Sequence, residues 1–224
     1  MEEQFYTEYR TRITQFMQTH PALLERYQIE EVYLNPQDIL LKQGTAPKGV
    51  FILASGLVKV TRTTAASQLF TLGVFGPGEV EGDVEALMHM PHFCTVQALT
   101  PCRFHYMTSA QFLQLLAQEQ EFNLLMHRSM ASKMLNTSLQ SSIQNTNRLH
   151  YTLLIVLREL SGLNELQISK ALLTELLGTS QRNLNRLLAQ LEQEKLVQVK
   201  NGLVMHLERA LIQKKIEKYD FEVH

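Results

Sequence analysis

The spacing of hydrophobic positions changes along the chain and divides it into three stretches. In residues 1–27, apolar side chains recur every three or four positions until Pro21 interrupts the chain, which predicts one amphipathic helix. From about residue 28 to 107, short β-rich runs alternate with glycine and proline, and seven of the ten glycines lie between positions 44 and 82. Many short strands separated by such turns indicate a β-barrel or jelly roll. The predicted strands include the runs 32–34, 39–41, 50–53, 57–60 and 69–72.

Beyond residue 107 the spacing becomes helical. Thr108 or Ser109 can cap a short helix that runs to about Ala117. Residues 119–147 then contain neither glycine nor proline, which predicts one long helix of about 40 Å. A helix of this length is expected to bury its apolar stripe against its own barrel and against a partner. We therefore expect a homodimer joined along this helix.

The last stretch predicts several short helices and a hairpin. Helices are expected over residues 151–160, 171–177, 180–193 and 208–218. Between the last two, the runs 196–200 and 203–207 flank Asn201-Gly202. Asn-Gly between two apolar runs is typical of a hairpin with a type I′ turn.

The segment from Lys170 to Leu191 carries the most specific chemistry. A short apolar helix stops at Gly178, Thr179-Ser180 can cap the next helix, and leucines form the inner face of that helix. With the hairpin that follows, this order predicts a winged helix-turn-helix. Arginine can hydrogen-bond both guanine acceptors at once, and glutamine or asparagine can do so with adenine. The side chains expected to read bases are Gln181, Arg182, Asn185 and Arg186. Those expected near phosphates are Lys170, Thr179, Ser180, Asn183 and Lys200.

Charge and composition agree with an intracellular DNA-binding protein. The formal net charge is −1, but residues 1–147 carry 10 Lys+Arg against 13 Asp+Glu, and residues 148–224 carry 11 against 9. The slightly basic C-terminal stretch fits a polyanionic partner. We expect a cytoplasmic protein without a membrane segment, because no apolar run approaches about 18 residues and the N-terminus has no secretory signal.

The chain resembles the cAMP receptor protein / fumarate-nitrate regulator superfamily of bacterial transcription factors. The resemblance covers nearly the whole chain and depends most on the segments 42–44, 50–60, 75–79 and 176–188. It implies an α+β fold with an N-terminal β-barrel of the jelly-roll, cyclic-nucleotide-binding type, a long dimerisation helix and a C-terminal winged helix-turn-helix. The corresponding domains are expected at residues 1–107, 108–147 and 148–224.

The resemblance also implies function and partners. A homodimeric regulator is expected to bind a pseudo-palindromic site on double-stranded DNA and to contact RNA polymerase, for which residues 161–165 are a candidate. Three family positions that read bases match Gln181, Arg182 and Arg186. Relatives often have glutamate at the middle position, which can accept a hydrogen bond from cytosine. Arg182 cannot accept, so we expect a different half-site.

The predicted barrel lacks key parts of a cyclic-nucleotide site. Members that bind cyclic nucleotides carry Gly-Glu, then Arg-Ser for the cyclic phosphate, and Thr-Ser on the long helix for the base. Here Asp83 replaces the glutamate, His92-Phe93 replaces Arg-Ser, and Thr137-Ser138 match the last pair. Without the arginine a phosphate loses its bidentate partner, and the carboxylates of Asp83 and Glu85 repel it. We therefore predict no cAMP dependence and no cofactor. The candidate effector pocket comprises Asp83, Glu85, His92, Phe93, Thr137 and Ser138, with Phe93 filling the space of the lost ligand.

Other interpretations stay open. Cys94 and Cys102 could form a redox pair, although two buried apolar residues are the simpler reading. His89, His92 and His105 could bind a metal or haem, but their spacing is not diagnostic, and we predict no metal site. An enzyme of the metal-binding barrel type would need His-x-His with a carboxylate. The sequence has no such pattern and no nucleophile–base pair, so we do not expect an enzyme. A protein-interaction scaffold is the remaining alternative, and activation cannot be distinguished from repression.

Overall fold

The computed structural model describes residues 2–67, 69–142, 145–161 and 168–222 and shows two compact units. One unit comprises Glu2–Asn136 and the other Thr137–His224. Each unit is described by itself below. The three-part division into barrel, dimerisation helix and DNA-binding domain stays a prediction.

The first unit begins with two helices, α1 (Glu2–Thr19) and α2 (Pro21–Arg26). The predicted amphipathic helix with an interruption at Pro21 is confirmed as α1, whereas the short helix α2 after the interruption was not predicted. Proline has no backbone N–H to continue a helix, but it fits the first position of a new one. Pro21 stands at that position of α2, directly after His20.

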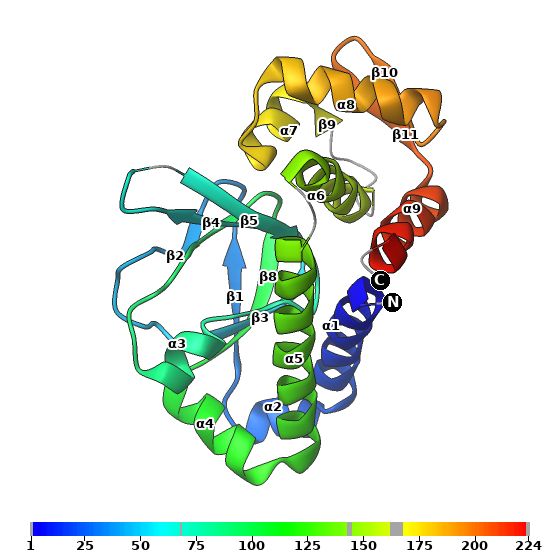
Figure 1. Cartoon of the computed structure of the whole chain (residues 1–224). Coiled ribbons are helices and arrows are strands. Elements are labelled where there is room, and N and C mark those ends of the chain that lie inside the picture. Colours follow the sequence, from blue (N-terminus) through cyan, green and yellow to red (C-terminus); the bar gives the residue numbers. More distant parts are fainter. Residues whose placement is uncertain (1, 68, 143–144, 162–167, 223–224) are drawn as a thin grey trace. The chain divides into compact units, whose positions relative to one another are not determined.

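Eight strands follow and form two four-stranded antiparallel sheets, ordered β1-β8-β3-β6 and β2-β7-β4-β5 (Figure 1). All five predicted strand runs are confirmed. The predicted runs are three or four residues long, and several strands extend beyond them. The sequence reading missed β6, β7, β8 and the short helix α3. The bounds are β1 Glu30–Leu34, β2 Ile39–Leu41, β3 Val50–Ser55, β4 Val58–Thr63, β5 Leu69–Phe75, β6 Val80–Glu81, α3 Asp83–Met88, β7 Thr95–Ala98 and β8 Cys102–Met107.

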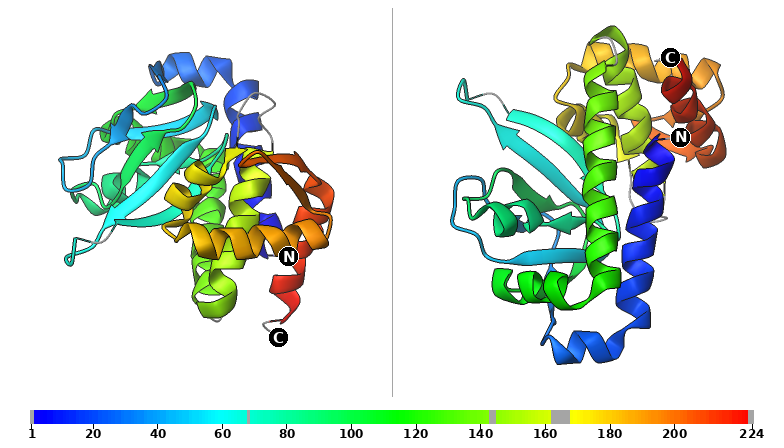
Figure 2. Two further views of the ribbon diagram at one scale, coloured as in Figure 1. Left: turned by 90° about the horizontal axis from the view of Figure 1, so that it is seen from above. Right: turned by 60° about the horizontal axis from the view of Figure 1, so that its bottom comes forward.

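Two apolar clusters hold this unit together. One lies among the strands and includes Leu53, Val58 and Phe104. The other joins the barrel to the helices, with Ile13 and Phe122 among its fully buried members. Figure 2 shows the reason for the second cluster, since α1 runs beside α5 along the barrel. The helices therefore cover apolar surface that the sheets leave open.

Two further helices complete the first unit. In α4 (Ser109–Gln118), the Thr108 hydroxyl accepts the Gln111 backbone N–H at 3.2 Å, and the Gln111 side chain accepts the Thr108 backbone N–H at 2.7 Å. This capping box confirms Thr108 as the N-cap. The long helix α5 (Gln120–Ser142) continues into the second unit. Of two methionines on α5, Met126 is buried, whereas the side chain of Met134 is 68% exposed.

Residues 120–142 of the predicted long helix form α5, and residues 145–147 are helical in α6 (Asn145–Leu160). Residues 143–144 of that prediction lie outside the described residues. Near the end of α5, the Ser141 hydroxyl donates to the Thr137 carbonyl at 2.8 Å.

In the described part of the second unit, two further helices and a small sheet pack around leucine-rich faces of α6 and α8. The elements after α6 are β9 Ile168–Ser169, α7 Lys170–Leu177, α8 Gln181–Gln193, β10 Val197–Lys200, β11 Leu203–Leu207 and α9 Arg209–Glu222. The sheet order is β10-β11-β9, and β9 was not predicted. Asn201 and Gly202 both have positive φ, +52° and +77°, as the predicted type I′ turn requires. Among the described residues, no helix is long and apolar enough to span a membrane.

Candidate nucleic-acid interface and effector site

The turn between α7 and α8 is built by local hydrogen bonds. Gly178 closes α7 in the left-handed conformation, with φ +57°. The Ser180 hydroxyl then accepts the backbone N–H of Asn183 at 3.3 Å and caps α8. Of the predicted capping pair Thr179-Ser180, serine is therefore the cap. This turn fixes where the first residues of α8 emerge.

Replacing Ser180 with alanine is expected to lower the free energy of unfolding by about 0.5–1 kcal/mol, because the Asn183 N–H loses its acceptor. Chemical unfolding without DNA measures this change. Thr179→Ala is the matched control, since its side chain is not the cap and should cost less. Equal losses in both variants would contradict the assignment.

The outer face of α8 is polar and exposed over its first two turns. Four leucines are buried on the inner face: Leu184, Leu187, Leu188 and Leu191. The predicted base-reading side chains are all exposed on other faces: Gln181, Arg182, Asn185 and Arg186. The structure thus brings these four together near the N-terminal end of α8, where unpaired backbone N–H groups also favour an anion.

The predicted phosphate-contacting residues lie around this helix and the hairpin. Lys170 is half-buried at the start of α7, and its backbone N–H donates to the Gly202 carbonyl at 3.0 Å. This bond ties the first turn of α7 to the hairpin tip. Thr179 is half-buried, while Ser180, Asn183 and Lys200 are exposed. Their contact with phosphate stays a prediction. Of the candidate RNA polymerase segment 161–165, residues 162–165 lie outside the described residues.

The predicted effector residues are divided between the two compact units. Asp83, Glu85 and His92 are buried in the barrel unit. Thr137 and Ser138 are exposed on α5 in the part of the chain that belongs to the other unit. That the two groups form one effector pocket stays a prediction.

Phe93 does not fill an interior space, which makes that expectation wrong. Its side chain is 47% exposed, and the Arg62 guanidinium carbon stacks 3.4 Å from its ring centroid. A cation over an aromatic face is favourable, and here it holds the ring at the surface.

A buried ion-pair cluster in the barrel was missed by the sequence reading. The Lys133 ammonium on α5 lies 2.8 Å from a Glu79 carboxylate oxygen and 3.8 Å from an Asp83 oxygen. It also donates to the Val80 carbonyl at 2.8 Å. The only signal in the sequence was a lysine interrupting the apolar stripe of a long helix.

This cluster holds more negative than positive charge, and the pKa values respond. Burial, reinforced by the neighbouring Glu79 carboxylate, raises the pKa of Glu81 well above its ordinary value. Burial also raises the pKa of Asp83. For Lys133, burial acts to lower the pKa, but the surrounding carboxylates outweigh it and raise the pKa. An anion placed here would meet further repulsion.

The two cysteines are both reduced and poorly activated. Cys94 is half-buried and Cys102 is buried, with no disulfide between them. Burial raises the pKa of both thiols, that of Cys94 to about 12. A thiolate is the reactive form, so neither thiol is poised for redox chemistry. Among the residues that the structure describes, no group of three His, Cys, Asp or Glu side chains is arranged to hold a metal ion.

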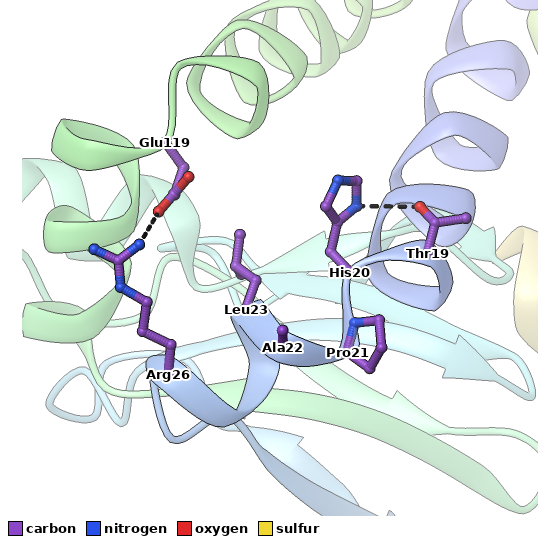
Figure 3. A pocket seen from close by; sticks show the side chains of 7 residues that line it. All are labelled: Thr19, His20, Pro21, Ala22, Leu23, Arg26 and Glu119. Atoms are coloured by element: carbon purple, nitrogen blue, oxygen red, sulfur yellow. Dashed lines mark hydrogen bonds and ion pairs between the residues drawn. The ribbon is translucent and has the colours of Figure 1, made fainter.

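A shallow pocket of about 310 Å³ lies where α1, α2 and the start of α5 meet (Figure 3). Polar side chains that line it already hydrogen-bond to one another. Arg26 donates to Glu119 at 3.0 Å, and the His20 ring lies 3.1 Å from the Thr19 hydroxyl. This pocket therefore offers little to orient a ligand.

Comparisons with known proteins give one matching protein family and a similar curated protein. Residues 31–119 match the cyclic nucleotide-binding domain family. The chain is 32% identical over 178 residues to the cyclic AMP receptor protein of Thermus thermophilus. The aligned region covers 76% of this chain and 81% of that protein.

Solved structures support the fold. The c-di-GMP-responsive global regulator CLP of Xanthomonas campestris has a TM-score of 0.61 at 17% identity, covering 83% of this chain and 98% of that chain. A transcriptional regulator of the CRP/FNR family from Thermus thermophilus also has a TM-score of 0.61, at 20% identity, covering 84% and 98%. These similarities show that the chain shares its fold with these two proteins.

Proposed function

Since the chain belongs to the cAMP receptor protein / fumarate-nitrate regulator superfamily of transcriptional regulators, we propose that it is a homodimer that binds a specific pseudo-palindromic DNA site. The observation that carries this proposal is the outer face of α8. Two arginines and two amide side chains are exposed there, while the leucines of the same helix are buried. Burial fixes the helix in its unit and leaves the polar face free for a partner.

In the proposed complex α8 enters the major groove with its N-terminal residues at the base edges. Arg182 and Arg186 are suited to guanine, and Gln181 and Asn185 to adenine. Residues at the helix starts and at the hairpin contact phosphates and set the register: Lys170, Thr179, Ser180, Asn183 and Lys200. Arginine at position 182 selects a half-site different from that of relatives with glutamate there.

Exposed apolar side chains on α5 support dimerisation. Leu124, Met134 and Leu135 are exposed, although they are large apolar residues. A second copy that buries them would pair two copies of α8. Two half-sites would then lie about 34 Å apart along the DNA. We propose RNA polymerase as a further partner.

We also propose that cAMP does not control this regulator. The carboxylates of Glu79, Glu81, Asp83 and Glu85 crowd the segment where a cyclic phosphate would need a cation. Lys133, the cation beside them, is already paired with two carboxylates.

Selection of binding sites from random duplex DNA by the purified, ligand-free protein tests the proposal. We expect enrichment of a palindrome and a steep loss of affinity as salt rises, because phosphate contacts release counterions. A folded protein that enriches no sequence, both alone and with cell extract, would contradict the proposal. A protein-interaction scaffold would show no steep salt dependence on DNA, and metal analysis of the purified protein would reveal a barrel metal enzyme.

A further inference from the structure

The barrel contains a carboxylate that serves as a hydrogen-bond acceptor for its own backbone. Glu85 is buried in the first turn of α3, and its side chain accepts the backbone N–H of Phe93 at 2.8 Å. Eight residues separate the two, so the bond closes the loop that follows α3. A buried N–H needs an acceptor, and a carboxylate gives a charge-assisted bond.

The neighbouring backbone holds this loop in place from the other side. The backbone N–H of His92 donates to the Thr45 carbonyl at 2.9 Å, and the His92 carbonyl accepts from the Gly44 N–H at 2.8 Å. The loop from 89 to 94 is thus held at His92 by two backbone hydrogen bonds and at Phe93 by the bond to the Glu85 carboxylate.

The His92 side chain adds a neutral imidazole. Its Nε2 accepts the Lys48 backbone N–H at 3.2 Å, which places the ring proton on Nδ1. Burial lowers the pKa of His92, so the ring is neutral at pH 7. The Nδ1 atom is buried and has no hydrogen-bond partner among the described residues. A buried donor therefore lies beside the loop without an acceptor.

Two cations of the barrel unit have partners within the chain. The Arg62 guanidinium stacks on Phe93 and donates to the Phe93 carbonyl at 3.5 Å. The Lys133 ammonium is paired with Glu79 and Asp83. These two cations and the Phe93 N–H therefore already have partners within the chain.

We propose that the Glu85 carboxylate takes the place of an anionic effector in the barrel. It accepts the backbone N–H of Phe93, so that this N–H needs no external anion. This inference deepens the proposed function, because it concerns how the barrel of the regulator is controlled. Its test uses no DNA, so its failure is separate from failure of DNA binding.

Replacing Glu85 with alanine or serine tests the proposal, with Glu121→Ala, an exposed acid on α5, as the control. Thermal unfolding is measured in sodium chloride, formate, acetate, phosphate and cAMP at equal ionic strength. Amide hydrogen exchange of the peptide containing Phe93 is followed in parallel. In chloride we expect a lower Tm and at least tenfold faster exchange at Phe93 for the Glu85 variants. Formate, acetate or phosphate should recover at least half of each change, whereas wild type and Glu121→Ala should not respond to any anion.

Several results would overturn the proposal. Glu85 variants that stay insensitive to formate, acetate and phosphate would show that the carboxylate fills no anion site. Stabilisation of the wild-type protein by cAMP or phosphate would show that the site is open. If the variants fail to fold in chloride, formate or phosphate must restore soluble folded protein during refolding, and failure to do so would also overturn it. Rescue by formate and acetate but not by phosphate would limit the site to carboxylates and still support it.

Discussion

Replacing Lys133 with methionine is expected to destabilise the barrel unit by about 3 kcal/mol at neutral pH. Methionine keeps the length of the side chain but removes the ammonium that lies 2.8 Å from Glu79 and 3.8 Å from Asp83. Both carboxylates are buried, so the variant leaves them without their counter-charge. The value is placed at the low end for buried pairs because the Lys133 side chain retains 28% of its surface.

The loss should depend on pH in a definite direction. In the folded protein the pKa values of Glu81 and Asp83 are already raised, so these groups favour folding most when protonated. That contribution is complete below their unfolded pKa values of about 4 and is lost as pH rises through the raised folded values. Removing Lys133 raises those folded values further. The deficit of the variant should therefore grow with pH and be smaller at about pH 5 than at about pH 8.

Urea unfolding at several pH values measures the deficit, and hydrogen exchange of peptides from residues 76–90 locates it in the barrel. Lys42→Met is the matched control, because Lys42 is an exposed lysine of the same unit. A deficit that is equal at every pH, or one no larger than that of Lys42→Met, would show that the ion pairs contribute little to stability.

Replacing Arg186 with alanine is expected to weaken binding to the selected DNA site by about 1–3 kcal/mol, or roughly 5- to 150-fold. The Arg186 side chain is exposed on the outer face of α8, in the second turn of the helix. In the proposed complex this position allows a bidentate contact with guanine. Specificity at one base position of each half-site should relax at the same time. Fluorescence anisotropy against the site and its single-base variants measures both effects.

Gln193→Ala is the control on the same helix, since this exposed residue lies at the far end of α8. It should bind as wild type does. If Arg186→Ala weakens binding to all sequences equally, the side chain contacts phosphate and not a base. If it changes neither affinity nor selectivity, the assignment of the α8 outer face as the reading surface is wrong.

Much of the fold follows from short-range patterns in the sequence. The alternation of apolar runs with glycine and proline located five strands, because a strand needs only local periodicity and a turn residue at each end. Likewise Gly178, Ser180 and the leucines of α8 defined the helix-turn-helix within about 20 residues. The exposed polar face of α8 could be inferred because helical geometry fixes which side chains oppose the buried leucines.

Where the prediction failed, a competing local or long-range effect decided. Pro21 interrupts the first helix as predicted, but the chain then forms the short helix α2, which the apolar spacing did not reveal. Phe93 was expected to fill the space of the lost phosphate ligand, but its ring is exposed and stacks with the guanidinium of Arg62, a residue 31 positions earlier.

Periodicity and capping within short segments were enough to predict the barrel, the helix α8 and its outward-facing side chains. The matching of charges in the barrel could be seen only in the folded chain. Lys133 meets Glu79 and Asp83 across about 50 residues of chain, and the Glu85 carboxylate reaches the Phe93 N–H after the chain has turned back. Burial makes such pairing obligatory, since an unmatched charge or N–H in the interior is costly. Which partner satisfies each group depends on the packing of distant elements, and spacing along the chain does not reveal it.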